Sequence, residues 1–427
     1  MIDVAIVGAG LAGLYAARRL REKGVEAIVL EAEDRIGGRI YGFDIGDRSV
    51  QLGGRWLGPG QDHIKTLAAE LNVEIRDNTL FSDLGGGRAA EQENNLVALA
   101  RKLDDLASRV PLDRPWCAPD AEQLDSQTLA TWLKEHATPD TVQLADSILS
   151  GFLPMASDVS LLHAAFYLHS NGGFSGILGL DGTAHDSEMI VGGTHRLIQA
   201  LALNSDVYLN TPVRRISQEK EQVRLHGDHN AFDARLAILT PPPTLSGRIH
   251  FDPPLSPTRD YLVQRMPIRG KIVVTWLYDR PFWRDQNIRL HESDNLFMWD
   301  EGGNETPAAL SGLVSIGASA RLWALSPEQR TAHLFADAAR SFGSEVANVI
   351  DHYEIYWAAQ PFSRGCNSYL TTGAWTAYGS ALRPPVGRVG FAGSEYSPKF
   401  VGQMEGAVRS SEQAVTWAIQ QLENESG

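Results

Sequence analysis

A glycine-rich turn near the amino terminus constrains the fold more than any other feature of the sequence. Residues 4–7 (Val-Ala-Ile-Val) form a short apolar run, Gly8, Gly10 and Gly13 follow, and residues 14–23 carry apolar side chains at helical spacing. This order predicts a buried strand, a tight turn and a helix. In such a turn Gly8 allows the sharp bend, Gly10 lets the backbone approach a pyrophosphate, and Gly13 packs the helix against the strand.

A second apolar run and an acidic residue extend this pattern. Residues 27–30 predict the next strand, and Glu31 follows it, roughly 20 residues after the glycines, where a carboxylate accepts ribose hydroxyls. The start of the helix also offers backbone N–H groups to phosphate. A glycine motif alone is also compatible with a purely structural turn. The strand, helix and acid together indicate a nucleotide site.

Two glycine-arginine segments further along indicate which dinucleotide binds. The segments are Gly37-Gly38-Arg39 and Gly53-Gly54-Arg55, and each combines close backbone approach with a bidentate phosphate donor. NAD would not need this second set of glycines and arginines, whereas we expect FAD to need it, because its flavin reaches toward another domain. The alternative is that both segments are surface turns with solvated arginines.

Composition and charge exclude several classes of protein. The chain has 427 residues, 38 basic and 52 acidic, for a formal charge of −14, which argues against nucleic acid or an anionic membrane surface as the main partner. The cysteines Cys117 and Cys366 cannot form a disulfide framework, and no metal-ligand spacing is present. No signal peptide and no apolar run long enough to cross a bilayer is found, so we expect a cytoplasmic protein without a membrane partner.

Short motifs spread along nearly the whole chain resemble the flavin-containing monoamine oxidase family. Besides the glycine segments, they lie at residues 58–61, 115–119, 191–194, 241–245, 249–255, 281–283, 391–395 and 404–407. The resemblance implies that a hydride passes from the carbon beside an amine nitrogen to N5 of FAD. It further implies that the imine is released and hydrolysed, and that dioxygen reoxidises the flavin.

The resemblance and the segment order together predict the fold class. We expect an α/β protein with a Rossmann-like FAD-binding domain of the glutathione-reductase and amine-oxidase type, and an inserted substrate domain of mixed sheet and helices. The α/β patterns at both ends of the chain and the mixed middle favour a discontinuous first domain. The expected boundaries are 1–79, 188–245 and 384–427 for the FAD-binding domain, and 80–187 and 246–383 for the substrate-binding domain.

The resemblance also implies cofactor contacts beyond the glycine turn. A helix that begins near Gln403 and Met404 would direct its N–H groups at the N1–C2 edge of the flavin, although a helix that only packs its apolar face is compatible with the same pattern. The full set of expected cofactor residues is Gly8, Gly10, Gly13, Glu31, Arg39, Gly53, Gly54, Arg55, Val213, Cys366, Gly393, Ser394, Gln403 and Met404.

Cys366 occupies a position at which some family members carry a cysteine that bonds covalently to the flavin 8α carbon. The match lies in the segment Ser-Arg-Gly-Cys-Asn-Ser-Tyr at residues 363–369. We expect FAD to be attached through Cys366. The alternative is that Cys366 is a small buried apolar residue, which is the commoner role of a lone cysteine.

Two departures from the family concern the expected reaction centre. The two aromatic rings between which family amines approach the flavin are replaced by Asn367 and Gln403. A ring from elsewhere could substitute, and the candidates are Trp375, Tyr378, Tyr396 and Phe400. The family lysine that holds a water at flavin N5 is replaced by Val273. Lys271 lies two residues earlier, on the same face of an ideal strand but about 6–7 Å away along it.

A third departure concerns the substrate pocket. Family pocket positions are occupied by Asn171 and Arg196, and we expect both to converge with Asn367 and Gln403 near the flavin. Buried polar groups are costly unless paired, so such a pocket would favour a substrate with hydroxyl, amide or carboxylate groups. Alternatively, Arg196 braces an FAD phosphate or pairs with an acid. The expected catalytic residues are Lys271, Asn367, Gln403, Asn171 and Arg196.

These features predict flavin-dependent oxidation of a C–N bond in a polar or amino-acid-like amine. The expected partners are a small-molecule amine and dioxygen or another electron acceptor, with a homodimer as a candidate assembly. Two alternatives stay open. One is a dehydrogenase or desaturase that passes electrons to a protein or quinone, and the other is a weakly catalytic flavoprotein that serves as a binding partner.

Overall fold

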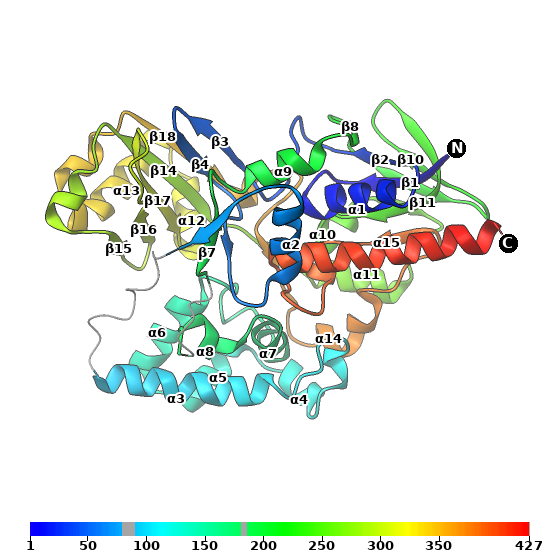
Figure 1. Ribbon diagram of the computed structural model, residues 1–427. Helices are drawn as coiled ribbons and strands as arrows, with labels where there is room; N and C mark the ends of the chain where they lie inside the picture. Colours follow the sequence, from blue (N-terminus) through cyan, green and yellow to red (C-terminus); the bar gives the residue numbers. More distant parts are fainter. Residues whose placement is uncertain (79–89, 181–185, 427) are drawn as a thin grey trace.

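The computed structural model describes residues 1–78, 90–180 and 186–426, and it places the glycine turn at the centre of a large mixed sheet (Figure 1). Strand β1 (Ile2–Val7) leads through the turn into helix α1 (Leu11–Glu22) and then strand β2 (Ala27–Leu30). Residues 4–6 of β1 are fully buried, because parallel strands in the middle of a sheet are covered on both faces. The predicted strand, turn, helix and strand are therefore confirmed.

The large sheet has the order β12-β9-β10-β11-β1-β2-β8, and β20 pairs with β11 beside this path. The strands β1, β2, β8, β11 and β20 form its parallel part, with Val4 opposite both Leu236 and Ala27. The other strands of this sheet are β8 (Asp206–Tyr208), β9 (Arg215–Gln218), β10 (Val223–His226), β11 (Ala231–Leu239), β12 (His250–Asp252) and β20 (Val389–Phe391). Because parallel strands share a direction, their carboxyl ends meet at one edge, where the glycine turn lies.

A five-stranded antiparallel sheet forms a second layer, on the upper left in Figure 1. Its order is β15-β16-β17-β14-β18, and the bounds are β14 (Ile272–Tyr278), β15 (Leu290–Glu292), β16 (Leu296–Asp300), β17 (Ala308–Val314) and β18 (Asp351–Tyr356). All residues of β14 are buried, since helices α12 (Ile316–Trp323) and α13 (Pro327–Phe342) cover one face. The hairpin of β3 (Gly42–Ile45) and β4 (Arg48–Gln51) covers the other face.

A group of helices occupies the lower part of Figure 1. They are α3 (Ala90–Ala107), α4 (Ala121–Asp125), α5 (Leu129–His136), α6 (Pro139–Leu149), α7 (Leu161–Ser170) and α8 (Gly173–Ile177). Helix α7 is buried on almost every side and packs against α3, α4, α5 and α8. A helix enclosed in this way can present residues to a site on one side and to the core on the other.

Helix α15 (Met404–Ser426) crosses the large sheet beside α1 and fixes the carboxyl terminus near the amino terminus (Figure 1). Ser411 donates its hydroxyl to the carbonyl of Ala12 at 3.0 Å, and Tyr15 donates to Glu412 at 2.6 Å. The other elements are β5 (Trp56–Leu57), α2 (Asp62–Glu70), β6 (Ile75–Asp77), β7 (Glu188–Ile190), α9 (His195–Ala202), α10 (Pro243–Ser246), α11 (Pro257–Gln264), β13 (Ile268–Arg269), β19 (Asn367–Ser368) and α14 (Ala374–Tyr378).

The mixed α/β class and the Rossmann-like sheet are confirmed, while the division of the chain into two domains stays a prediction. Strand β12 comes from the segment 246–383, which we assigned to the substrate-binding domain, yet it pairs with β9 of the large sheet. Within the part of the chain that the structure describes, no helix combines the length and apolar character needed to cross a lipid bilayer.

Candidate active site

A cavity of about 1940 Å³ lies where the three parts of the fold meet. Gly8 of the large sheet, Trp299 of the five-stranded sheet and Tyr167 of the helical group all contribute to its wall. Its volume exceeds the 300–1,000 Å³ or so that is typical of a site for one small ligand. The cavity therefore has room for a long cofactor together with a substrate.

The nucleotide end of this cavity is formed by the glycine turn. Gly8 has a φ of +101°, and a Cβ there would lie 2.5 Å from Oγ1 of Thr240, while a Cβ on Gly13 would overlap the carbonyl oxygen of Gly8. Gly10 differs, because a Cβ there would meet only the carbonyl oxygen of Gly37 at 3.9 Å. Gly10 and the first residues of α1 line the cavity, and no side chain caps the helix. Open space beside free N–H groups suits a phosphate.

Glu31 completes the nucleotide end. Its carboxylate accepts hydrogen bonds from the backbone N–H of Ala9 at 2.6 Å and of Glu33 at 2.8 Å, and it borders the cavity although the residue is almost fully buried. Burial raises the pKa of Glu31 despite these two bonds. A carboxyl group held in this way can still accept ribose hydroxyls, which are hydrogen-bond donors. The residues at this end therefore fit the adenosine half of FAD.

Arg39 and Arg55 line the cavity, and each forms an ion pair with a carboxylate. Arg39 binds both oxygens of Glu395 at 2.6 and 2.9 Å, and Arg55 forms a buried ion pair with Glu301. Burial works to raise the pKa of Glu395, but the Arg39 guanidinium outweighs burial and holds that pKa below its usual range. A guanidinium has five N–H donors, so these ion pairs do not exclude a phosphate contact, and the role of both arginines as phosphate donors stays a prediction. The alternative of solvated surface turns is wrong, because neither guanidinium is solvated freely.

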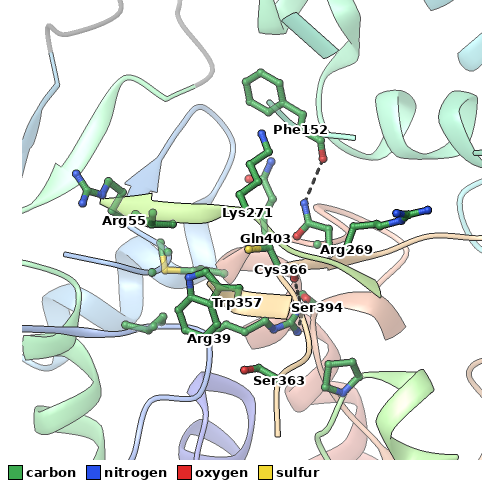
Figure 2. Close-up of a pocket in the computed structure, with 18 of the residues that line it drawn as sticks. Arg39, Arg55, Phe152, Arg269, Lys271, Trp357, Ser363, Cys366, Ser394 and Gln403 are labelled. Carbon is green, nitrogen blue, oxygen red and sulfur yellow. Dashed lines mark hydrogen bonds between the residues drawn. The ribbon is translucent and has the colours of Figure 1, made fainter. Parts of the chain in front are cut away.

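The other end of the cavity contains Cys366 and Lys271 (Figure 2). The backbone N–H of Cys366 donates to the carbonyl of Arg269 at 2.8 Å, and burial raises the pKa of its thiol while the charge of Lys271 opposes this rise. Lys271 donates from Nζ to the carbonyl of Ser150 at 2.6 Å. Burial lowers the pKa of Lys271 to about 8. Val273 lines the same cavity, as alternation along a strand requires.

Polar side chains surround this end of the cavity. Asn367 donates from Nδ2 to the carbonyl of Phe152 at 3.1 Å, which Figure 2 shows as a dashed line, and Gln403 accepts from Nε2 of Gln61 at 2.6 Å. A Cβ on Gly402 would touch both Tyr167 and Asn367 at 3.6 Å, so these two side chains lie close together. The structure thus places Asn367 and Gln403 in the cavity, as expected.

Tyr167 and Trp357 are cavity residues that the sequence did not predict. Both line the cavity and are almost fully buried, and Trp357 donates from Nε1 to the carbonyl of Leu52 at 2.8 Å. Burial raises the pKa of Tyr167, so its hydroxyl stays neutral at ordinary pH. A stretch that is apolar all round a helix, such as α7, contains no pattern that singles out one aromatic residue. The rings considered as replacements in the sequence analysis lie outside the lining of this cavity.

Asn171 and Arg196 do not join the cavity, so the expected four-residue cluster is wrong for these two. Asn171 is buried and donates from Nδ2 to the carbonyls of Tyr167 at 2.9 Å and Val401 at 3.3 Å. Arg196 is exposed and forms an ion pair with Asp44 at 2.9 Å, which is one of the alternatives weighed for it. Both side chains are held by these partners outside the cavity lining, and a single sequence does not reveal such non-local pairing.

The remaining expected cofactor residues border the cavity with one exception. Gly53, Gly54, Val213, Gly393, Ser394 and Met404 all contribute to its wall. Gly13 is outside the wall and instead allows α1 to approach the preceding turn, which is the packing role expected for it. The sites on β1, α1 and α15 therefore meet along one continuous cavity.

The fold and this cavity together define a protein that binds a dinucleotide cofactor. The family model for flavin containing amine oxidoreductase matches residues 11–417, and the chain belongs to this family. It is therefore a flavoenzyme that oxidises amines.

Comparisons with individual proteins cover nearly the whole chain. An L-amino acid dehydrogenase of Synechocystis sp. is 30% identical over 449 residues, covering 96% of this chain and 93% of the relative. A probable flavin-containing monoamine oxidase A of Dictyostelium discoideum is 30% identical over 441 residues, with 96% of both chains covered. The solved structure of cyclohexylamine oxidase from Brevibacterium oxydans IH-35A has a TM-score of 0.89 at 28% identity, with 99% of both chains covered.

Proposed function

We propose that the protein oxidises the C–N bond of a polar or amino-acid-like amine. The observation that carries this proposal is the pair of amides, Asn367 and Gln403, at the inner end of the cavity. Amide groups in a buried site favour ligands that satisfy them and penalise ligands that cannot. Similarity to an L-amino acid dehydrogenase supports the same substrate class.

The residues at the two ends of the cavity have separate tasks in this reaction. When FAD is bound, the N–H groups at the start of α1 would bind its phosphates, and Glu31 would accept hydrogen bonds from its ribose hydroxyls. FAD, when bound, takes up two electrons as a hydride from the carbon beside the amine nitrogen. Asn367 and Gln403 orient the amine, while Tyr167 and Trp357 exclude water from this end of the cavity. No general base is needed when the amine arrives neutral.

The test is an anaerobic screen of amines and amino acids that follows flavin absorbance. We expect bleaching with amines that carry hydroxyl, amide or carboxylate groups, and slower bleaching with benzylamine. Fastest bleaching by benzylamine would contradict the polar pocket. If none of the polar amines bleaches the flavin, the proposed substrate class is overturned.

The proposal also includes the acceptor that takes the electrons from the reduced flavin. We favour dioxygen, because the chain is similar to amine oxidases. The alternative is another electron acceptor. The similarity to a dehydrogenase and the presence of Val273 at the family lysine position favour that alternative. Stopped-flow mixing of the reduced enzyme with air separates the two. A fast second-order reoxidation supports dioxygen, and a slow one supports another acceptor.

We also propose that FAD is bonded covalently through Cys366, whose thiol lines the cavity. Acid precipitation should leave a yellow pellet for the wild type and for Cys117→Ser, which changes the other, exposed cysteine. It should leave a colourless pellet for Cys366→Ser. A colourless wild-type pellet from protein that was yellow before precipitation would overturn the covalent link but not the binding of FAD.

A cytoplasmic location and a homodimer stay predictions of the sequence. Fractionation of cells and sedimentation of the purified protein would test them separately.

A further inference from the structure

Lys271 is a half-buried cation whose side chain borders the inner end of the cavity. Nζ donates to the carbonyl of Ser150 at 2.6 Å, and no other partner of this ammonium is found among the described residues. An ammonium group has three N–H donors. Two of them are therefore available to a ligand in the cavity.

The other cations that line the cavity without being exposed are each paired with a carboxylate. Arg39 pairs with Glu395, Arg55 with Glu301, and Lys65 with Glu188. Among the described residues, Lys271 is the unexposed cation of the cavity lining that has no carboxylate partner. A buried charge without a counter-charge is costly, so an anionic ligand group would be stabilised here.

Two groups that lie close to Lys271 carry no negative charge that would compensate its own. Its backbone N–H interacts with the sulfur of Cys366. Burial raises the pKa of the free thiol and so keeps it uncharged, and a thioether to the flavin is uncharged as well. Asn367 uses Nδ2 to bind the carbonyl of Phe152, which leaves its Oδ1 as an acceptor in the same cavity. The inner end therefore offers a cation for a carboxylate and an amide oxygen for an amine N–H.

We propose that Lys271 binds the carboxylate of an α-amino acid substrate and thereby selects amino acids over simple amines. This inference rests on the proposed amine oxidation. The Cα–H bond breaks with its electron pair passing to the flavin, and the neutral amine nitrogen loses one proton as the C=N bond forms. Water then adds to the imino acid and releases ammonia, which gives a 2-oxo acid. Lys271 is in this scheme a specificity-determining residue that holds the carboxylate throughout.

The test compares each amino acid with the amine that lacks only its carboxylate. The pairs are L-leucine with 3-methylbutylamine, L-phenylalanine with 2-phenylethylamine, and L-arginine with agmatine. Flavin reduction is followed anaerobically, so that reactivity with dioxygen does not enter. We expect the wild type to prefer the amino acid in at least one pair. Lys271→Met should weaken apparent binding of that amino acid about 10- to 100-fold, with little change for its amine, because a charge-assisted hydrogen bond is lost.

Two further variants separate charge recognition from a structural role. Lys271→Arg keeps the charge and should retain part of the preference, whereas Lys134→Met removes an exposed lysine of α5 that does not line the cavity and should leave the preference unchanged. A readout independent of turnover is the dissociation constant of 2-aminoisobutyrate, which has no Cα–H bond to oxidise. Lys271→Met should raise this constant by a similar factor.

The outcomes distinguish the inference from the function on which it rests. If neither amines nor amino acids reduce the flavin, the proposed function itself fails. If amines reduce the flavin but the wild type shows no preference for the carboxylate, or Lys271→Met weakens both members of a pair equally, the inference is overturned. Should Lys271→Met not fold, the wild-type preference and Lys271→Gln decide by the same criteria.

Discussion

His163 on α7 shows how burial fixes the protonation of a single residue. Its Nδ1 accepts a hydrogen bond from Nε1 of Trp375 at 3.2 Å, and the residue is almost fully buried. Burial lowers the pKa of His163 from 6.5 to about 3. The imidazole is therefore neutral in the folded protein and takes up a proton when the chain unfolds near neutral pH.

The stability of the protein should consequently fall as the pH decreases through this range. The contribution of His163 to the free energy of unfolding is fully present above pH 6.5 and is lost progressively as the pH falls toward 3. At pH 5 the loss is about 2 kcal/mol. We expect His163→Gln, which keeps an acceptor for Trp375, to flatten the dependence of the thermal midpoint on pH between 7 and 5. The control His229→Gln changes an exposed histidine. An unchanged slope in His163→Gln would contradict the neutral buried imidazole.

Residues of the site differ in how far the sequence could reveal them. Glu31 and Gly10 are set by a local strand, turn and helix, so their positions were predictable from spacing. Tyr167 and Trp357 reach the cavity only because segments distant in the sequence pack around it. The pairing of Arg39 with Glu395 joins residues more than 350 positions apart, and no local pattern encodes it.

At the scale of elements, the contact between β1 and α1 depends on one glycine. A Cβ on Gly13 would overlap the carbonyl oxygen of Gly8 and would also approach the side chain of Ile6 at 3.3 Å. Both neighbours belong to the turn and strand that position the helix start. The helix cannot move away without disturbing the N–H groups that face the cavity.

We therefore expect Gly13→Ala to destabilise the protein by about 2–3 kcal/mol, as overpacking does, and to lower its flavin content. Gly176→Ala is the matched control, because Gly176 also lies in a helix, α8, but a Cβ there meets nothing within 4 Å. The control should be neutral or stabilising by up to about 1 kcal/mol. Urea unfolding and the ratio of flavin to protein check both variants, and equal effects of the two would refute the packing argument.

The strands and helices themselves were largely predictable. The apolar run at residues 272–278 forms β14, and its alternate residues face α13 on one side and the β3–β4 hairpin on the other. Strand periodicity also explains why Lys271 and Val273 share the cavity. The pattern did not reveal that β12 joins the large sheet, because strand pairing is a non-local choice.

At the scale of the whole molecule, a buried ion pair connects the FAD-binding segments to the five-stranded sheet. Arg55 precedes β5, and Glu301 follows β16, and both side chains are shielded from solvent. The Arg55 guanidinium also lies 5.2 Å from the ring of Trp299. Removal of one partner from such a pair leaves an uncompensated buried charge.

Glu301→Gln should accordingly destabilise the protein by about 3 kcal/mol or more. Asp233→Asn, which breaks the exposed pair with Arg224, should change stability by less than about 1 kcal/mol. Thermal unfolding of both variants at low and high salt provides the measurement. A loss in Glu301→Gln no larger than that in the control would show that the pair does not join the two parts.

The sequence by itself determined the nucleotide-binding unit, the α/β class and the resemblance to a family, because these follow from periodicity and from motifs within a few tens of residues. Only the tertiary structure decided which polar groups meet. It placed Asn367 and Gln403 in the cavity and Asn171 and Arg196 outside its lining, and it left Lys271 without a counter-charge among the residues that the structure describes. The physical reason is that pairing between side chains depends on how elements far apart in the sequence pack together. Local propensity does not determine that packing.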